Sequence, residues 1–148
     1  MYEGVTLTNS HVAGGTLGAA VGVNNGTFNM YGGTISNCTN KSGSGMGGAV
    51  AVRSDDQGRD SVVFNMYGGS IEGCVSGNST SPTHVLGGVV FVHDGTFNMK
   101  GGSISGNKIK KGDGLYGAGA GVCLSKSNVT ISGGSITNNV TDHTDNKR

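Results

Sequence analysis

Short stretches of this chain alternate apolar residues with small or polar ones, and such stretches recur along most of its length. Val21 and Val23 flank a glycine, and Phe28 and Met30 flank an asparagine. A Gly-Gly pair follows, and the next apolar residue is Ile35. A period of two indicates a β-strand, because successive side chains of a strand point to opposite faces. The pattern therefore predicts short strands separated by glycine-rich corners.

The alternating stretches repeat as a unit, and equivalent residues of the units form five apolar columns. A partial unit at the N-terminus puts Leu7 in the isoleucine column. One unit cannot bury its own apolar face, whereas units stacked in parallel place like residues about 4.8 Å apart and bury a continuous column. The columns are Val21, Val50, Val90 and Val122; Val23, Val52, Val92 and Leu124; Phe28, Phe64, Phe97 and Val129; Met30, Met66, Met99 and Ile131; and Ile35, Ile71, Ile104 and Ile136.

Composition restricts the fold in the same direction. Glycine accounts for 30 of the 148 residues and proline for one, and 5% of the residues are aromatic. So much glycine disfavours helices, and so few aromatic residues favour a thin core that repeats along an axis. We therefore predict an all-β chain folded as a right-handed parallel β-helix, a solenoid of about four coils with three short strands each.

The repeats indicate a single domain over residues 1–148, which we expect to be part of a longer solenoid. Residues 1–17 form a partial N-terminal coil in this scheme, and residues 141–148 form a polar tail. Uneven spacing between the repeats predicts protruding loops, and insertions on repeat scaffolds often mark a binding face. The predicted loops are an insertion at residues 53–62 and return loops at residues 39–46, 75–86 and 108–117.

Charge and hydropathy argue against two classes of partner. The net charge is +1 and the basic residues are scattered, apart from Lys108, Lys110 and Lys111, so the chain lacks the electrostatic footprint of a nucleic-acid-binding protein. No run of about 18 apolar residues occurs, so we predict no insertion into a membrane. Residues 1–10 lack the charged and apolar regions of a signal peptide.

The chain has three cysteines, and such a small and odd number does not indicate a disulfide framework. Cys38 and Cys74 share a column with Asn107 and Asn139, at the turn that follows the isoleucine strand. Stacked asparagines at a turn can bond side chain to backbone between coils, and cysteine is the apolar substitute that faces inward. We expect a buried pair of thiols here, with a disulfide as the alternative because stacked coils bring Cα atoms within bridging distance.

The recurrent patterns G-G-x-V-x-V and G-T-F-x-M-x-G-G-x-I-x-x-N resemble bacterial cell-surface proteins built on a pectate-lyase-like β-helix. They are also loosely similar to the passenger domains of polymorphic outer-membrane adhesins. Residues Gly47 to Val50 match the G-G-A-[IV] repeat of those adhesins, and residues 104–107 and 136–139 match an I-x-x-N ending. The resemblance implies a secreted or cell-surface protein whose ligand is a glycan or another molecule of a host or cell surface. It does not specify an activity, because this fold carries many functions.

The outward positions of the strands carry the candidate binding residues. A polar and aromatic strip of this kind can stack on sugar rings and bond their hydroxyl groups, which makes glycan a candidate ligand. Equally, aromatic and asparagine columns stabilise a sheet through contacts between coils. The strip consists of Tyr31, Tyr67 and Lys100 in one column and of Asn29, Asn65 and Asn98 in the next.

A polysaccharide-acting enzyme is the alternative function, with its catalytic site incomplete or outside this segment. Lyases need several carboxylates on neighbouring coils to hold a cation, plus a lysine or arginine that takes a proton. Glu72 is the one carboxylate in sixteen outward strand positions, and Asp55, Asp56 and Asp60 of the insertion depart from a calcium-binding spacing. We therefore predict a non-catalytic, adhesin-like binding or structural module with no cofactor and no metal site.

The outer face of the valine strand is apolar where water is expected. Soluble monomers usually avoid a continuous apolar stripe, so either the long loops or a partner should cover it. The candidate interface residues are Ala49, Ala51, Val89 and Phe91. We expect incomplete cover and hence weak homo-association, either through this stripe or through the unpaired strand edges at the ends of the stack.

Overall fold

A computed structural model describes residues 1–14, 17–42, 46–54, 62–77, 88–111 and 119–143. Within these ranges every regular element is a β-strand, and none is a helix long and apolar enough to cross a membrane. The chain is therefore all-β over the residues that are described, as the sequence predicts.

The strands form three sheets, and every pair of neighbouring strands is parallel. The four-stranded sheet contains β3 (Val21–Val23), β7 (Val50–Arg53), β11 (Val90–His93) and β14 (Val122–Ser125). The seven-stranded sheet contains β1 (Thr6–Thr8), β4 (Gly26–Met30), β5 (Thr34–Ser36), β8 (Val62–Met66), β9 (Ser70–Glu72), β12 (Gly95–Ser105) and β15 (Asn128–Thr137). The five-stranded sheet contains β2 (His11–Val12), β6 (Thr39–Asn40), β10 (Val75–Ser76), β13 (Lys108–Lys111) and β16 (Val140–His143).

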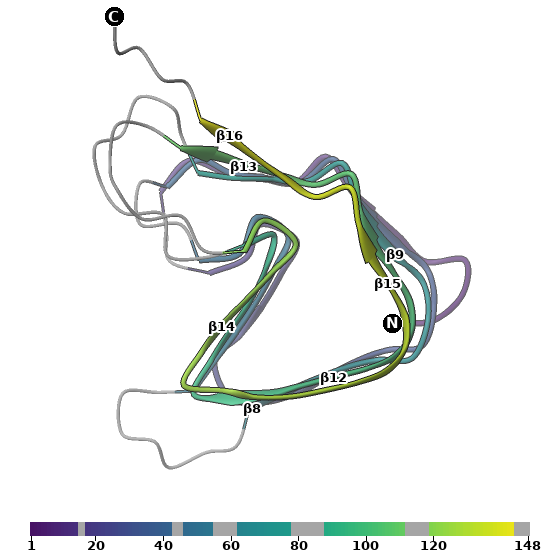
Figure 1. Cartoon of the computed structure of the whole chain (residues 1–148). Helices are drawn as coiled ribbons and strands as arrows, with labels where there is room; N and C mark the ends of the chain where they lie inside the picture. The colour runs from purple at the N-terminus through teal and green to yellow at the C-terminus, as the bar shows by residue number, and fades with distance from the viewer. Residues whose placement is uncertain (15–16, 43–45, 55–61, 78–87, 112–118, 144–148) are drawn as a thin grey trace, which may run out of the picture.

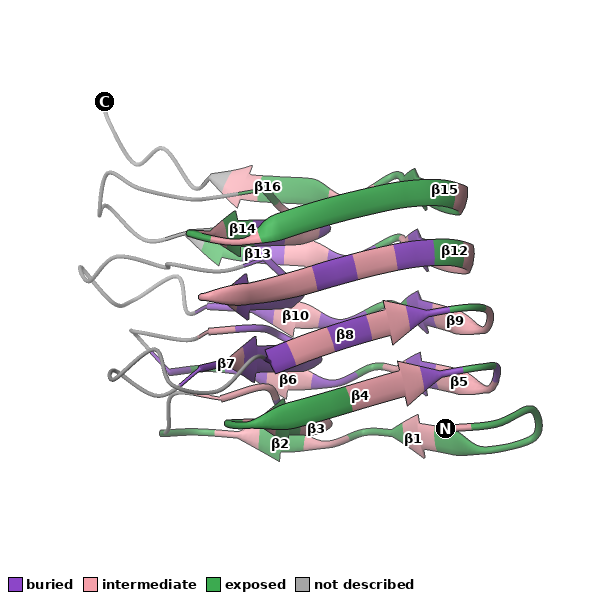
Figure 2. Cartoon of the chain, turned by 90° about the horizontal axis from the view of Figure 1, so that it is seen from below, coloured by how far each residue is buried: buried purple, intermediate pink, exposed green. Residues whose placement is uncertain are grey.

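The chain visits the four-, seven- and five-stranded sheets in the same order in each repeat, and one such passage is called a coil below. The first coil is partial and contains β1 and β2. The later coils contain β3–β6, β7–β10, β11–β13 and β14–β16. Successive coils overlie one another when the molecule is viewed along the stack (Figure 1). From the side, the strands of each coil lie directly against those of the next, from β1 at one end to β15 and β16 at the other (Figure 2).

The five predicted apolar columns are confirmed by the register of the strands. Phe64, for example, lies opposite Phe28 on one side and Phe97 on the other, and the ring centroids are 5.2 Å apart in both pairs. Leu7 lies opposite Ile35, as expected for the partial N-terminal coil. The columns are fully buried in the third and fourth coils, so the core is a thin cylinder between the sheets.

Glycine corners allow the coils to stack closely. Gly33, Gly69, Gly102 and Gly134 occupy equivalent corners with φ between 83° and 87°, a conformation that glycine adopts without a steric penalty. A Cβ atom on Gly69 would lie 2.5 Å from the carbonyl oxygen of Gly33 in the coil below. These glycines are therefore required by the approach of one coil to the next.

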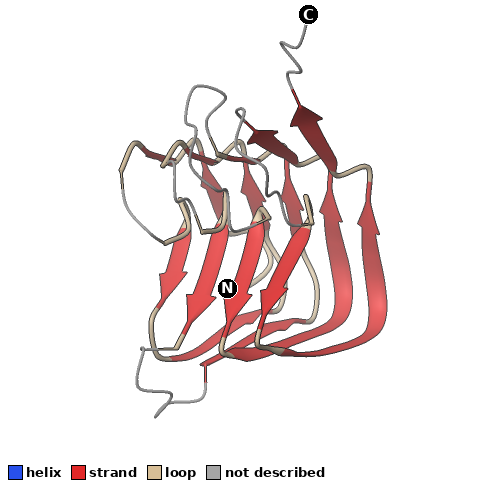
Figure 3. Ribbon diagram, turned by 60° about the vertical axis from the view of Figure 1, so that its left-hand side comes forward, coloured by secondary structure: helices blue, strands red, loops and turns tan. Residues whose placement is uncertain are grey.

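The five-stranded sheet was not predicted, because its strands begin where the sequence suggests return loops. β6 and β10 have only two residues each, and their sequences, Thr-Asn and Val-Ser, carry no apolar alternation. Likewise, residues 141–143 belong to β16 rather than to a polar tail. Arg53 and Val62 of the predicted insertion belong to β7 and β8. Residues 43–45, 55–61, 78–86 and 112–117 of the predicted loops, and residues 144–148, lie outside the described residues. Figure 3 shows the strand directions in the sheets.

Candidate functional site

The predicted tyrosine column forms a continuous stack on the outer surface. The rings of Tyr31 and Tyr67 are 4.8 Å apart at an interplanar angle of 11°. Tyr2 extends the stack at the N-terminal end, with its ring centroid 5.1 Å from that of Tyr31. At the other end, the Lys100 Nζ lies 5.1 Å from the centroid of the Tyr67 ring, within the range of a cation–π contact. The column therefore runs over four coils.

This stacking determines which parts of the rings face a ligand. Both faces of the Tyr31 ring are covered, by Tyr2 on one side and Tyr67 on the other. The Tyr67 ring is covered by Tyr31 and Lys100. A sugar that stacks on an aromatic face needs that face free, so these two residues offer only ring edges and hydroxyl groups. The edges of Tyr2, Tyr31 and Tyr67 remain exposed to solvent.

Tyr2 is not among the residues predicted from the sequence, although the sequence carries a signal for it. Met1-Tyr2-Glu3-Gly4 matches Met30-Tyr31-Gly32-Gly33, and one additional residue, Val5, then separates it from the isoleucine strand. The backbone N–H of Tyr31 donates to the carbonyl oxygen of Met1 at 2.8 Å, which sets Met1 and Tyr2 in the methionine and tyrosine columns. The extra residue hides this match from a comparison at fixed spacing.

The adjacent asparagine column is bonded along the stack. The amide Nδ2 of Asn65 donates to Oδ1 of Asn29 at 2.8 Å, and Nδ2 of Asn98 donates to Oδ1 of Asn65 at the same distance. The Asn65 side chain therefore uses both its amide nitrogen and its carbonyl oxygen within the column. The two columns lie beside one another, because Asn29 and Asn65 are in β4 and β8, and Tyr31 and Tyr67 follow directly after the last residues of these strands.

Hydroxyl groups of the isoleucine strand also pair between coils. The Ser70 hydroxyl donates to Oγ1 of Thr34 at 3.3 Å, and the Ser36 hydroxyl donates to Oγ1 of Thr8 at 3.2 Å. Glu72 lies in register with Ser36 and Ser105 and its side chain is exposed. A shallow hollow of about 300 Å³ follows the glycine corners nearby, and its lining consists of Glu3, Gly4, Val5, Thr6, Gly33, Thr34, Gly69 and Ser70.

The column of Cys38, Cys74, Asn107 and Asn139 is bonded from coil to coil, as expected. The side chain of each upper residue accepts the N–H of the residue below it: Oδ1 of Asn139 from Asn107, Oδ1 of Asn107 from Cys74, and Sγ of Cys74 from Cys38, at 3.1, 2.9 and 3.4 Å. Cys38 and Cys74 are buried thiols and form no disulfide. Burial raises the pKa of the Cys74 thiol to about 12. Burial also raises the pKa of Cys123.

The four candidate interface residues of the valine strand are buried within the single chain, so at these positions the apolar stripe is covered without a partner. Ala49, Ala51 and Val89 have no exposed surface, and Phe91 is 2% exposed within the single chain. Leu17 lies over the outer face of β3, because a Cβ atom on Gly22 would be 3.1 Å from that of Leu17. The periodicity of a strand shows which residues face outward but not what covers them.

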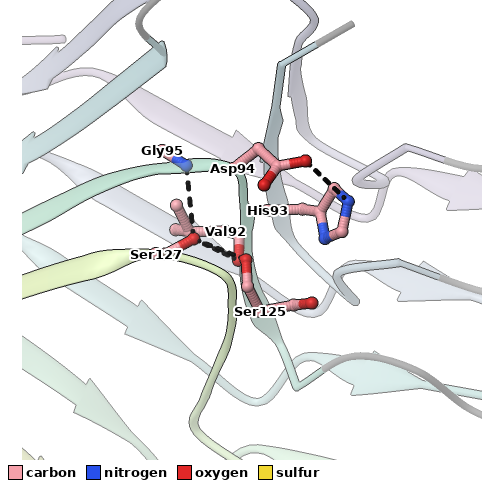
Figure 4. Close-up of polar contacts among 6 residues, drawn as sticks. All are labelled: Val92, His93, Asp94, Gly95, Ser125 and Ser127. Carbon is pink, nitrogen blue, oxygen red and sulfur yellow. Dashed lines mark hydrogen bonds and ion pairs between the residues drawn. The ribbon is translucent and has the colours of Figure 1, made fainter. Parts of the chain in front are cut away.

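A cluster of histidine, aspartate and serine side chains lies at the corner between β11 and β12 (Figure 4). Nε2 of His93 is 3.2 Å from Oδ2 of Asp94, the next residue in the chain. The Ser127 hydroxyl accepts the Gly95 N–H at 3.3 Å and lies 3.1 Å from the Val92 carbonyl oxygen. The contacts of Ser127 join the fourth coil to the fifth, so this serine holds the turn.

The other candidate residues are a lysine group and the acidic residues. The Lys108 Nζ lies 3.5 Å from Oδ2 of Asp142 across β13 and β16. Among the described residues no group of three or more histidine, cysteine, aspartate or glutamate side chains lies close enough to hold a metal ion. Asp55, Asp56 and Asp60 lie outside the described residues. No protein family, no curated protein and no solved structure matches this chain.

Proposed function

We propose that the chain is a right-handed parallel β-helix that serves as a non-catalytic structural and binding module of a bacterial surface protein. The observation that carries the proposal is the bonding of the outward columns along the stack. Asn65 donates to Asn29 and accepts from Asn98 within their column, and the tyrosine rings cover one another. Side chains engaged in this way stabilise a long, rigid scaffold and leave few groups for chemistry.

Glycan binding is the second candidate, favoured by the exposed edge of the tyrosine column. The hydroxyl groups of Tyr31 and Tyr67 follow one another along the stack, with the charged Lys100 next to them. A ligand on this face would bond to hydroxyl and ammonium groups rather than stack on a ring. A row of that kind suits an extended, acidic polysaccharide, whose hydroxyl and carboxylate groups also recur along an axis.

A glycan array separates the two candidates. If the module is purely structural, no glycan signal should depend on the tyrosine column. The Asn65→Ala variant should then lose thermal stability. A glycan signal that is retained in Asn65→Ala but lost in Lys100→Ala would favour glycan binding instead. Both variants should be shown by circular dichroism to be folded before they are compared.

The enzymatic alternative has its own test. Incubation with acidic polysaccharides and Ca²⁺ should release no unsaturated products, because Glu72 has hydroxyl-bearing neighbours in its column rather than other carboxylates. Turnover by the wild type that Glu72→Gln abolishes would overturn the non-catalytic proposal. The Ser105→Ala variant is a matched control at the next position of the same column.

A further inference from the structure

The shallow hollow at the glycine corners is bordered by a column of hydroxyl groups. Its volume of about 300 Å³ lies at the lower end of the range of about 300 to 1,000 Å³ that is usual for ligand sites. Thr6, Thr34 and Ser70 line it, and these residues are in register in the first three coils. Gly33 and Gly69 also line it, and because they have no side chains they leave the hollow unfilled.

The first corner of the chain differs from the later ones and forms one wall of the hollow. Val5 is an additional residue relative to the corners at residues 32–33 and 68–69, and the loop before β1 projects beyond the later corners (Figure 1). The Glu3 side chain lies over the second coil, since a Cβ atom on Gly32 would be 2.6 Å from its Oε2. Val5 is 43% exposed. The hollow therefore combines a carboxylate, hydroxyl groups and a small apolar surface.

The hydroxyl groups beside the hollow keep hydrogen-bonding capacity that the asparagine column uses internally. The Ser70 hydroxyl donates to Thr34, and the Ser36 hydroxyl donates to Thr8. Because a hydroxyl group carries both a donor and acceptor lone pairs, Ser70 retains its lone pairs and Thr34 retains its donor. Asn65, by contrast, both donates and accepts within its column. The hydroxyl columns are therefore better suited to bind a ligand than the asparagine column.

The charges around the hollow restrict the kind of ligand. Glu72 shares the outward side of β9 with Ser70, and its side chain is exposed. The charged residues among those that line the hollow or continue its hydroxyl columns in the first three coils are Glu3 and Glu72, and both are acidic. Like charges brought together oppose binding, which disfavours an acidic polysaccharide at this place. Carboxylates accept strong, charge-assisted hydrogen bonds, which favours a ligand rich in hydroxyl groups.

We propose that the hollow and its hydroxyl columns bind a neutral polysaccharide that lies along the stack. Hydroxyl groups of the sugars donate to the carboxylates of Glu3 and Glu72 and exchange hydrogen bonds with Thr34 and Ser70. The columns repeat about every 4.8 Å along the stack, so an extended chain meets similar groups on successive coils. This inference rests on the glycan-binding candidate above, and it places the ligand beside the tyrosine column rather than on it.

Affinity electrophoresis tests the proposal by comparing migration in native gels with and without a soluble polysaccharide. Galactomannan, mixed-linkage β-glucan and hydroxyethyl cellulose serve as the neutral polymers, and polygalacturonate serves as the acidic one. Ser70→Lys places a long side chain in the hollow, and Glu72→Gln removes the charge but keeps an acceptor. Thr96→Lys is the matched control, because it makes the same kind of change on β12 at a residue that does not line the hollow. Circular dichroism should show that all three variants are folded.

The neutral polymers should slow the wild type and Thr96→Lys but not Ser70→Lys. Glu72→Gln should bind about fivefold more weakly, because it loses a charge-assisted hydrogen bond. The proposal is overturned if no neutral polymer slows the wild type, or if Ser70→Lys is slowed as much as Thr96→Lys. Retardation of the wild type by polygalacturonate alone would also overturn it, because the ligand would then lie at the tyrosine edge.

Reducing ends measured in the same mixtures test the proposed function separately. A non-catalytic module should release none from any of the four polymers. Their release would contradict the non-catalytic proposal even where the binding results hold. A loss of binding without such release would overturn the inference about the hollow and leave the structural role of the module in place.

Discussion

Met66 and Ile131 occupy the same column at the same position of the repeat, yet Met66 is fully buried and Ile131 is 56% exposed. The difference arises from their neighbours: Met66 lies between Met30 and Met99, whereas Ile131 has Met99 on one side only. A coil of this protein therefore has no core of its own. Its apolar residues become a core only when another coil lies on each side.

The largest expected effect comes from placing a charge at each of these two positions. Met66→Asp should unfold the chain, because burying an unpaired carboxylate costs several kcal/mol against a typical total stability of about 5 to 15 kcal/mol. Ile131→Asp should cost about 1 kcal/mol or less, because its carboxylate reaches water. Far-UV circular dichroism during urea unfolding compares the variants, and equal stability would mean that the middle and end coils do not differ in this way.

How far the sequence predicts this arrangement depends on the strength of the local signal. The apolar columns were predictable, because residues such as Phe28, Phe64 and Phe97 repeat with an alternation that only a stack can bury. The cysteine and asparagine column was predictable for the same reason. The five-stranded sheet was not, because two-residue strands such as Thr39–Asn40 have no periodicity, and their pairing depends on the coils on either side.

The candidate site was only partly predictable, again because of contacts between segments. The tyrosine and asparagine columns were located correctly on one face, but their sequence does not show whether the side chains bond to one another or to a ligand. Phe91 is 2% exposed, although strand periodicity places it on the outward side of β11.

A second comparison concerns the asparagines at the same turn of the fourth and fifth coils. Asn107 is buried and donates from Nδ2 to Ile71 O and to Asn139 Oδ1, both at 2.9 Å. In Asn107→Ala, the buried Cys74 N–H loses its acceptor, at a cost of about 1 to 3 kcal/mol. Asn139→Ala should cost about 1 kcal/mol, because Asn139 is half-buried and water can replace its bonds. Urea unfolding of the two variants measures the difference, and a larger loss in Asn139→Ala would contradict this account.

The Cys74 thiol gives a smaller effect that depends on pH. Its pKa is raised by burial from 9.0 to about 12, so the folded chain keeps the thiol neutral where the unfolded chain ionises it. The resulting stability is fully present below pH 9 and is lost as the pH rises from 9 towards 12. Unfolding free energies of wild type and Cys74→Ser over this range should therefore converge or cross as the pH rises. Parallel curves would mean that burial does not hold the thiol neutral.

The smallest expected effect concerns the tyrosine column, where the comparison between middle and end applies to the outer surface. Tyr31 stacks on two rings and Tyr2 on one. An aromatic pair contributes about 0.5 to 1.5 kcal/mol beyond the area that it buries, so Tyr31→Ala should lose about twice as much stability as Tyr2→Ala. Both rings are exposed, so the difference reflects stacking rather than burial.

A double-mutant cycle of Tyr31→Ala and Tyr67→Ala isolates the pair, because the ring of each residue is removed with and without the other in place. A coupling near zero would mean that the column does not stabilise the stack, and it would leave the tyrosine edges to be explained by a ligand.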